Sequence, residues 1–276
     1  MAGREVMGAA LHIGTQGWNY DTWSGRFYPR GVKSVDRLEL YSRLFGTVEV
    51  DSTFYAMPPP GRFRSWYERT PADFRFTAKL PRDITHDARL VGVDDLLLEF
   101  CDRASELEEK LGPLLIQLPP DMAVRERPAV DAFVRSLPRE LEFAIEFRDA
   151  EWFDARTMDL LHSLDVTLAV SVGPWLTTPA ALDVAARAPG RFQYLRWMGS
   201  PRHQELNAAL VEARDEDLAR WAERILDALP GKPAVYAYFN NDYQGHSPES
   251  ARRLQALLGV EPADADILHE QPDLFT

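Results

Sequence analysis

Eight short runs rich in β-branched and aromatic residues recur along the chain, separated by longer amphipathic stretches. We expect strands near residues 11–16, 47–53, 74–80, 114–118, 142–148, 167–172, 192–197 and 234–240, with starts 25 to 42 residues apart. This spacing is typical of repeated strand–helix units. Eight such units in about 250 residues, with no Ser- or Gly-rich linker between them, favour one barrel. The sequence therefore predicts an α/β fold consisting of a single (β/α)8 TIM-type barrel.

The main alternative is a doubly wound sheet made of two Rossmann-like halves. No predicted strand is followed by a Gly-x-Gly-x-x-Gly turn, which weakens that alternative. We predict an N-terminal extension at residues 1–10, the TIM-type barrel at residues 11–259 and an acidic C-terminal tail at residues 260–276. From Glu261 onward the chain has five acidic residues and no Lys or Arg.

Charge and composition exclude several classes of partner. The net charge of −12 argues against nucleic acids and anionic membranes, which require a basic protein surface. The single cysteine, Cys101, excludes an internal disulfide and a Cys-rich zinc site. No apolar run approaches the roughly 18 residues that span a bilayer, and residues 1–10 do not resemble a signal peptide. We expect a cytoplasmic protein that binds a small molecule; its oligomeric state is not indicated.

Several predicted strands carry polar side chains on one parity. Side chains alternate along a strand, so if Phe143 and Ile145 face the helices, Glu146 and Arg148 face the interior. The same rule places these residues inside: Glu49, Asp51, Thr77, Lys79, Gln117, Arg196 and Asn240. A barrel interior is usually aliphatic, and buried charges are costly unless paired. The pattern therefore predicts a functional site at the carboxyl ends of the strands, or else an internal salt-bridge network of the same charges.

The catalytic candidates are Glu49, Asp51, Lys79 and Glu146. Carboxylates beside cations can act as general acid or base. Lys79 would donate to a developing oxyanion or, as the less favoured option, form a Schiff base. Arg148 and Arg196 would clamp a phosphate or carboxylate, because guanidinium groups bind such anions through two parallel hydrogen bonds.

Two loops add candidates for substrate binding. Residues 14–29 are dense in aromatics that either stack on a sugar or base or simply cover the mouth of the barrel. Residues 240–246 precede a predicted helix start, where they either hold an anion or form a plain capped turn. The expected substrate-binding residues are Trp18, Tyr20, Tyr55, His86, Gln117, Arg148, Arg196, Asn240, Asn241 and His246.

The sequence requires no cofactor. His86 and His246 could join the strand-end carboxylates around a divalent ion, but no local ligand spacing supports this. We therefore predict no metal ligands, while a divalent metal stays open as a minority hypothesis.

Several of these motifs are familiar as a set. They resemble the domain-of-unknown-function 72 family, the YecE-like proteins, over about residues 11–258. The matching segments are 13–20 (IGTQGWNY), 23–29 (WSGRFYP), 45–55 (FGTVEVDSTFY), Pro58, Trp66, 76–79 (FTAK), 85–86 (TH), 112–120 (GPLLIQLPP), 146–148 (EFR), 238–242 (YFNND) and 245–246 (GH).

The resemblance implies a TIM-type barrel and no established activity. A similarity to sugar-isomerase-type barrels is an analogy at the level of fold only. The chain departs from the expected family pattern at two positions. Asp51 stands where we expect Asn, and Met198 stands before Gly199 where a His is frequent, which puts any activity that depends on that His in doubt.

Three functions are consistent with the sequence. The favoured one is an enzyme acting on a small polar, anionic or carbohydrate-like substrate at the mouth of the barrel, by isomerisation, lyase or hydrolase chemistry. The second is a protein that binds or senses a small molecule without chemistry. The third is a metal-dependent, nuclease-like barrel, which the net charge of −12 disfavours.

Overall fold

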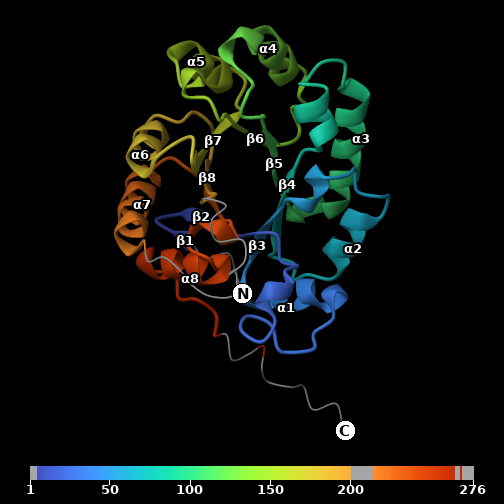
Figure 1. The fold of residues 1–276 in the computed structure, drawn as a ribbon, viewed down its shortest axis with the longest axis vertical. Helices are drawn as coiled ribbons and strands as arrows, with labels where there is room; N and C mark the ends of the chain where they lie inside the picture. The colour runs from blue at the N-terminus through green and yellow to red at the C-terminus, as the bar shows by residue number, and fades with distance from the viewer. Residues whose placement is uncertain (1–4, 200–213, 265–267, 269–276) are drawn as a thin grey trace.

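The structure, a computed structural model, describes residues 5–199, 214–264 and 268. Within these residues nine strands form one sheet, and eight α-helices lie around it (Figure 1). The strands are β1 (Glu5–Val6), β2 (Ala9–Gln16), β3 (Thr47–Val50), β4 (Arg75–Lys79), β5 (Leu111–Gln117), β6 (Phe143–Glu146), β7 (Thr167–Val172), β8 (Gln193–Trp197) and β9 (Ala234–Phe239). The helices are α1 (Arg37–Leu44), α2 (Arg62–Glu68), α3 (Asp94–Ala104), α4 (Arg127–Ser136), α5 (Ala155–Ser163), α6 (Thr178–Ala186), α7 (Asp215–Ala228) and α8 (Ser247–Leu257).

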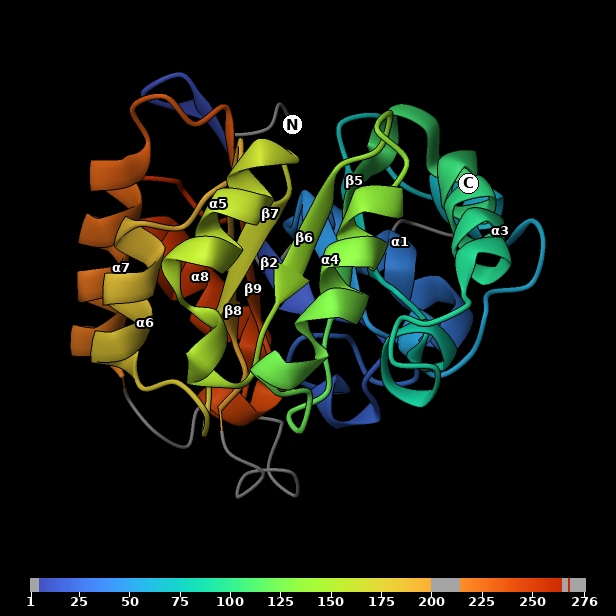
Figure 2. The ribbon, with the colours of Figure 1, turned by 90° about the horizontal axis from the view of Figure 1, so that it is seen from above.

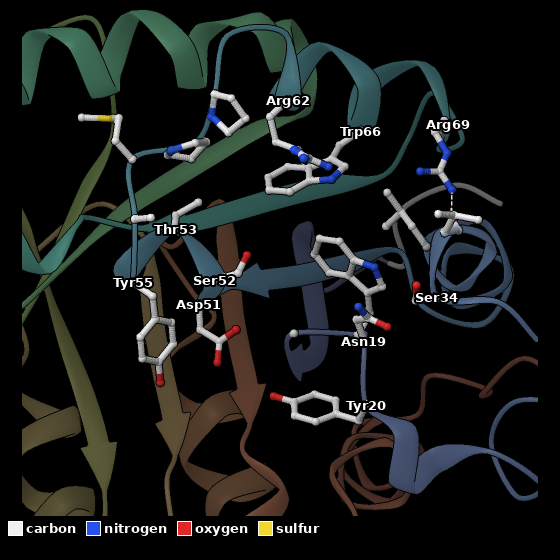
Figure 3. Close-up of a pocket in the computed structure, with 18 residues that line it drawn as sticks. Asn19, Tyr20, Ser34, Asp51, Ser52, Thr53, Tyr55, Arg62, Trp66 and Arg69 are labelled. Atoms are coloured by element: carbon white, nitrogen blue, oxygen red, sulfur yellow. Dashed lines mark hydrogen bonds between the residues drawn. The ribbon is translucent and has the colours of Figure 1, made fainter.

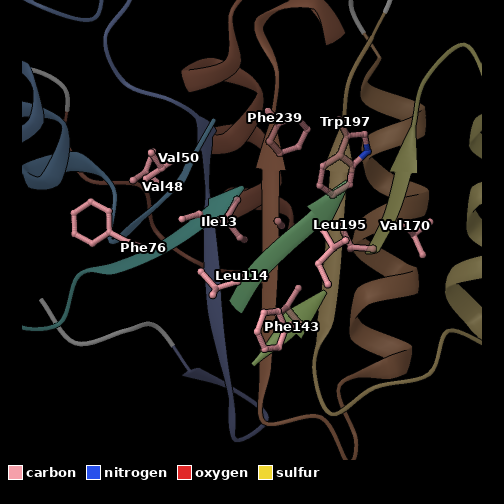
Figure 4. Packing of buried hydrophobic residues seen from close by; sticks show 14 of the residues in the cluster. Ile13, Val48, Val50, Phe76, Leu114, Phe143, Val170, Leu195, Trp197 and Phe239 are labelled. Atoms are coloured by element: carbon pink, nitrogen blue, oxygen red, sulfur yellow. The ribbon is translucent and has the colours of Figure 1, made fainter. Parts of the chain in front are cut away.

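All eight predicted strands are present, with ends shifted by at most three residues. The predicted alternation is also confirmed. Outward side chains such as Val48, Phe143 and Leu195 pack with the helices in the main core (Figure 4). The opposite parity forms a second buried cluster on the inner face of the sheet, made of Leu115, Ala144, Ala169, Phe192, Tyr194, Tyr236 and Tyr238.

The predicted fold class, an eight-stranded TIM-type (β/α)8 barrel, is wrong, because the sheet has nine strands and is mixed. Residues 5–6, expected to be part of an extension, form β1 antiparallel to the start of β2. The parallel strand β3 pairs with β2 only at Thr15 and Gln16. β2 also pairs in parallel with β9 over residues 10–15. The other strands pair in chain order from β3 to β9.

A tyrosine side chain bridges the short β2–β3 junction. The hydroxyl of Tyr41 accepts a hydrogen bond from the Thr15 amide (3.0 Å) and donates one to the Thr47 carbonyl (3.0 Å). The Tyr41 hydroxyl therefore satisfies the Thr15 amide and the Thr47 carbonyl, which would form β-sheet hydrogen bonds if β2 and β3 paired over more residues. The physical reason for the departure from a regular barrel is this junction, which has few backbone pairs and one buried side chain.

The carboxyl ends of the strands lead directly into short helical turns. β3 is followed by a 3₁₀ turn at Ser52–Phe54, and β6 by another at Ala150–Trp152. These turns place side chains that follow each strand over the same edge of the sheet. Figure 2 shows the strands between α6 and α7 on one side and α3 on the other. The boundaries of the predicted domain stay a prediction, and most of the predicted acidic tail lies outside the described residues.

Gly14 generates a prediction about the β2–β3 junction. A Cβ at Gly14 would lie 2.4 Å from the Thr47 carbonyl oxygen, whereas a Cβ at Gly46 would meet nothing within 4 Å. Overpacking of this kind costs about 1–3 kcal/mol. We expect Gly14→Ala to lower the melting temperature by several degrees and Gly46→Ala to leave it nearly unchanged, as measured by thermal denaturation. Equal melting temperatures for the two variants would contradict the close approach of β2 and β3.

Candidate active site

A buried arginine on β8 connects charged residues of two other strands. The Nε of Arg196 donates to both carboxylate oxygens of Glu49 (3.1 and 3.0 Å), and its Nη2 donates to Oε1 (2.8 Å). The Nη1 of Arg196 donates to Glu146. The side chains of both glutamates are 0% exposed. The structure therefore brings together three predicted site residues from β3, β6 and β8.

Each glutamate in this network has a second donor. The Nε of Arg148 donates to Glu146 (2.9 Å), and the hydroxyl of Tyr194 donates to Glu49 (2.7 Å). Burial alone would raise the pKa of Glu146, but the charges of Arg196 and Arg148 lower it to about 2. Glu146 is consequently a carboxylate at neutral pH.

Lys79 lies at the end of β4 and belongs to no such pair. It is 7% exposed, and its Nζ lies 3.5 Å from the ring centroid of Phe54. Among the described residues, no hydrogen bond or salt bridge holds this amine. Burial and the nearby charge of Arg196 lower the pKa of Lys79 to about 7.

Arg148 and His86 face the same region. The guanidinium carbon of Arg148 lies 4.0 Å from the Trp175 ring centroid, and its terminal nitrogens make no hydrogen bond within the described part of the chain. Burial, followed by the charges of Lys79 and Arg148, lowers the pKa of His86 to about 4. His86 is therefore a neutral imidazole at neutral pH.

The orientation of His86 follows from Thr85. The Thr85 hydroxyl donates to the Pro81 carbonyl (3.3 Å) and lies 2.9 Å from Nδ1 of His86. Because that hydroxyl has one proton, it accepts from Nδ1 and leaves Nε2 as the acceptor nitrogen. The ring of His86 also packs edge-on against Phe54, with 4.8 Å between centroids.

A cavity of about 700 Å³ lies between the segments that follow β2 and β3, and its lining residues do not include Lys79, Glu146 or Arg148. Trp18, Tyr20, Asp51, Tyr55 and Trp66 are among its lining residues. Figure 3 shows the Tyr20 hydroxyl pointing toward Asp51. Burial and the charge of Glu49 raise the pKa of Asp51, against the opposing charges of Lys79 and Arg196. No arginine or lysine of the described residues forms a salt bridge with Asp51.

Other predicted binding residues lie further from the charged cluster or are held by structural bonds. The Asn241 side-chain oxygen accepts hydrogen bonds from Trp23 (3.1 Å) and from the amide and hydroxyl of Ser247 (3.1 and 2.8 Å). His246 packs edge-on against Trp23, with 6.0 Å between centroids. Both residues therefore anchor the segment before α8 to the loop after β2.

Two further predicted residues lie at the carboxyl ends of strands, Asn240 directly after β9 and Gln117 as the last residue of β5. Asn240 donates to the Gln16 side chain (3.0 Å), and Gln16 donates in turn to the sulfur of Met198 (3.1 Å). Gln117 is buried on β5, in register with Glu146 on β6.

The sequence interpretation missed Phe54 and Trp175. Phe54 contacts both Lys79 and His86, and Trp175 supports Arg148. Both residues follow predicted strands, and this position in the sequence could have identified them as candidates for the site. The partner of each ring could not be read from the chain, because the contacts join loops distant in sequence.

A family model described as "Protein of unknown function DUF72" matches residues 12–274. The chain belongs to the DUF72 family. The resemblance drawn from the motifs is therefore confirmed.

Curated relatives and solved structures agree with this membership. The DUF72 chain is 38% identical over 143 residues to the UPF0759 protein YecE of Escherichia coli K12, a match covering 52% of this chain and 50% of YecE. The chain thus spans about half the length of that relative. It is 25% identical over 289 residues to the UPF0759 protein YunF of Bacillus subtilis, covering 96% and 100% of the two chains.

A solved DUF72 protein from Thermotoga maritima has a TM-score of 0.74 and 24% identity, covering 90% of this chain and 99% of its own. A second, from Enterococcus faecalis, has a TM-score of 0.70 and 18% identity, covering 91% and 98%. At these identities the two structures show a shared fold, which is that of DUF72 proteins.

No group of three or more His, Cys, Asp or Glu side chains in the described part of this DUF72 protein is arranged to hold a metal ion. No helix there is long and apolar enough to cross a membrane.

The buried network makes stability depend on acid in a defined window. Because the pKa of Glu146 falls from 4.5 to about 2 on folding, its ionised form stabilises the protein above pH 4.5, and this contribution is lost as the pH falls through about 2. We expect Glu146→Gln to reduce the free energy of unfolding by about 3–5 kcal/mol at pH 7. The difference from wild type should shrink as the pH falls from 4.5 to 2, as measured by urea denaturation.

The matched control is Glu249→Gln. Glu249 pairs with Arg253 (3.3 Å) at a partly exposed site, so its loss should cost less than about 1 kcal/mol. A constant difference between wild type and Glu146→Gln across the acid window would show that Glu146 is not held ionised.

Proposed function

We propose that this DUF72 protein is an enzyme that acts on a small anionic substrate at the carboxyl ends of its strands, with Lys79 as the group that takes up a proton. The observation that supports this is a division among the buried charges. Glu49 and Glu146 form salt bridges with Arg196 and Arg148. The amine of Lys79 forms no salt bridge within the described residues and lies over the Phe54 ring.

The charge balance explains why Lys79 is suited to this role. Glu49 and Glu146 together carry two negative charges, which Arg196 and Arg148 compensate. An additional ammonium at Lys79 would stand uncompensated in a buried site, which disfavours the protonated form. A pKa of about 7 places this amine where a general base is most effective at neutral pH.

Arg148 is the proposed anion-binding residue. Its Nε is fixed by Glu146 and its plane is supported by Trp175, so its terminal nitrogens are oriented before any ligand binds. A guanidinium held in this way binds a phosphate or carboxylate bidentately. In this proposal Arg196, by contrast, serves to hold the two glutamates, since it is fully buried between them.

Asp51 connects the two parts of the proposed site, because it interacts electrostatically with Lys79 and also lines the cavity, which Lys79 and Arg148 do not line. Burial and the charge of Glu49 raise the pKa of Asp51, and in this proposal Asp51 is the acid that acts together with Lys79. A volume of about 700 Å³ lies within the usual range for small-molecule sites, roughly 300–1,000 Å³. Trp18 and Trp66, which meet edge-on at 5.4 Å, would supply the apolar wall against which the rest of the substrate packs.

A ligand screen followed by a turnover assay tests the proposal. Sugars, sugar phosphates and small carboxylates are screened by thermal shift, and hits are then followed for conversion by NMR. A ligand at ten times its Kd adds about 1.4 kcal/mol of stability, a shift of a few degrees. We expect anionic hits whose shift disappears in Arg148→Ala and whose conversion is lost in Lys79→Met.

Arg156→Ala is the matched control, because Arg156 is exposed and pairs only with Asp131 among the described residues. Its shifts should equal those of wild type. Hits that persist in Arg148→Ala would refute the anion site. Hits that depend on Arg148 but show no conversion would favour a binding or sensing protein instead.

A further inference from the structure

The four lysines of the chain differ in what holds their amines. Lys110 is 4% exposed, and its Nζ donates to the carbonyls of Tyr67 (2.6 Å) and Thr70 (2.7 Å). Lys232 donates to the Gly190 carbonyl, and Lys33 is exposed. Lys79 is 7% exposed and has no such bond within the described residues. The Lys79 nitrogen is not among the fully buried atoms without a partner, so the amine reaches solvent at the end of β4, where a ligand can contact it.

The surroundings of Lys79 favour a nucleophilic amine. The Phe54 ring lies at 3.5 Å on one side, and the guanidinium groups of Arg196 and Arg148 act on the amine from the network. Burial and the charge of Arg196 disfavour the ammonium form, against the cation–π contact with Phe54, which favours it. Burial and neighbouring cations are the usual way in which enzymes activate a lysine. The nitrogen lone pair is then available at neutral pH for attack on carbon.

We propose that Lys79 forms a Schiff base with the carbonyl carbon of a small aldehyde or ketone that carries a phosphate or carboxylate. This inference rests on the proposed function and defines its substrate class, and it assigns Lys79 nucleophilic attack in place of proton uptake. The lone pair of Nζ forms the C–N bond as the carbonyl π electrons move to oxygen. Nζ gives up one proton and the oxygen takes up one, which yields the carbinolamine. The carbinolamine hydroxyl then leaves as water with a second proton, while Nζ gives up its other proton and the C=N bond forms. The reaction consumes one amine and one carbonyl and releases one water, and hydrolysis reverses it.

The neighbouring groups fit the other needs of this step. Asp51 interacts electrostatically with Lys79 and has a raised pKa, so it supplies the proton that the departing oxygen requires. Arg148, with its terminal nitrogens uncommitted within the described residues, holds the anionic group of the same substrate. Nε2 of His86 accepts a hydrogen bond from a substrate hydroxyl. Such a set selects an anionic carbonyl compound over a neutral one.

Reductive trapping tests this inference on the full chain. The protein is incubated at neutral pH with glyceraldehyde 3-phosphate and sodium cyanoborohydride, and labelling of each lysine is followed by peptide mass spectrometry. We expect Lys79 to be labelled at least about tenfold faster than Lys33, the preference that one charge-assisted anion contact provides. Uncharged glyceraldehyde is the matched probe and should lose most of this preference.

The variant Arg148→Ala should slow labelling of Lys79 about tenfold and leave Lys33 unchanged. Labelling of Lys79 no faster than that of Lys33 overturns the Schiff base. If Arg148-dependent stabilisation by inorganic phosphate persists in that case, the proposed function stands without the covalent step. If the phosphate effect is also absent, both proposals fail. Because Lys33 is an internal reference in the unmodified protein, the result does not depend on the folding of a Lys79 variant.

Discussion

The site depends on one guanidinium group that is completely buried. Arg196 reaches from β8 to Glu49 on β3 and Glu146 on β6, so one side chain connects three strands on the inner face of the sheet. A buried charge of this kind is tolerated only where its partners and hydrogen bonds are complete. Tyr194 on Glu49 and Arg148 on Glu146 supply the remaining donors. Removing either glutamate would leave Arg196 and Arg148 with one carboxylate between them, so that one positive charge of the network would have no counter-charge.

This network also determines which groups are available for chemistry. Because Arg196 occupies both glutamates, neither carboxylate is left without a cationic partner. The positive charge of Arg196 lowers the pKa of Lys79, and no carboxylate of the described residues forms a salt bridge with the Lys79 amine. The same glutamate that neutralises Arg196 fixes Nε of Arg148 and so directs its other nitrogens outward. One ion-pair network thus prepares both the proposed base and the proposed anion site.

The sequence predicted the strands well because alternation of side chains is a local property. Phe143 and Ile145 against Glu146 reveal a two-faced strand without any knowledge of its neighbours. The additional strand β1 was not predictable, because it depends on pairing with the start of β2. The short β2–β3 junction was not predictable either, because it depends on Tyr41 and Gly14 meeting Thr47 across the sheet. Likewise, the charged residues were found by parity, but which carboxylate meets which cation depends on three-dimensional distances. Phe54 lies against Lys79 and Trp175 lies against Arg148 only because distant segments pack together in the folded chain.

In the folded protein Lys79 is an amine that forms no salt bridge within the described residues and that is about half neutral at pH 7. Because the chain has only four lysines, selective ¹³C labelling at lysine Cε gives a spectrum simple enough to titrate residue by residue, with Lys79→Met to assign the resonance. We expect the Lys79 resonance to titrate with a pKa of about 7, separate from that of exposed Lys33. A Lys79 resonance that titrates at its ordinary value near 10.5 would show that the amine is charged at neutral pH and would contradict the account.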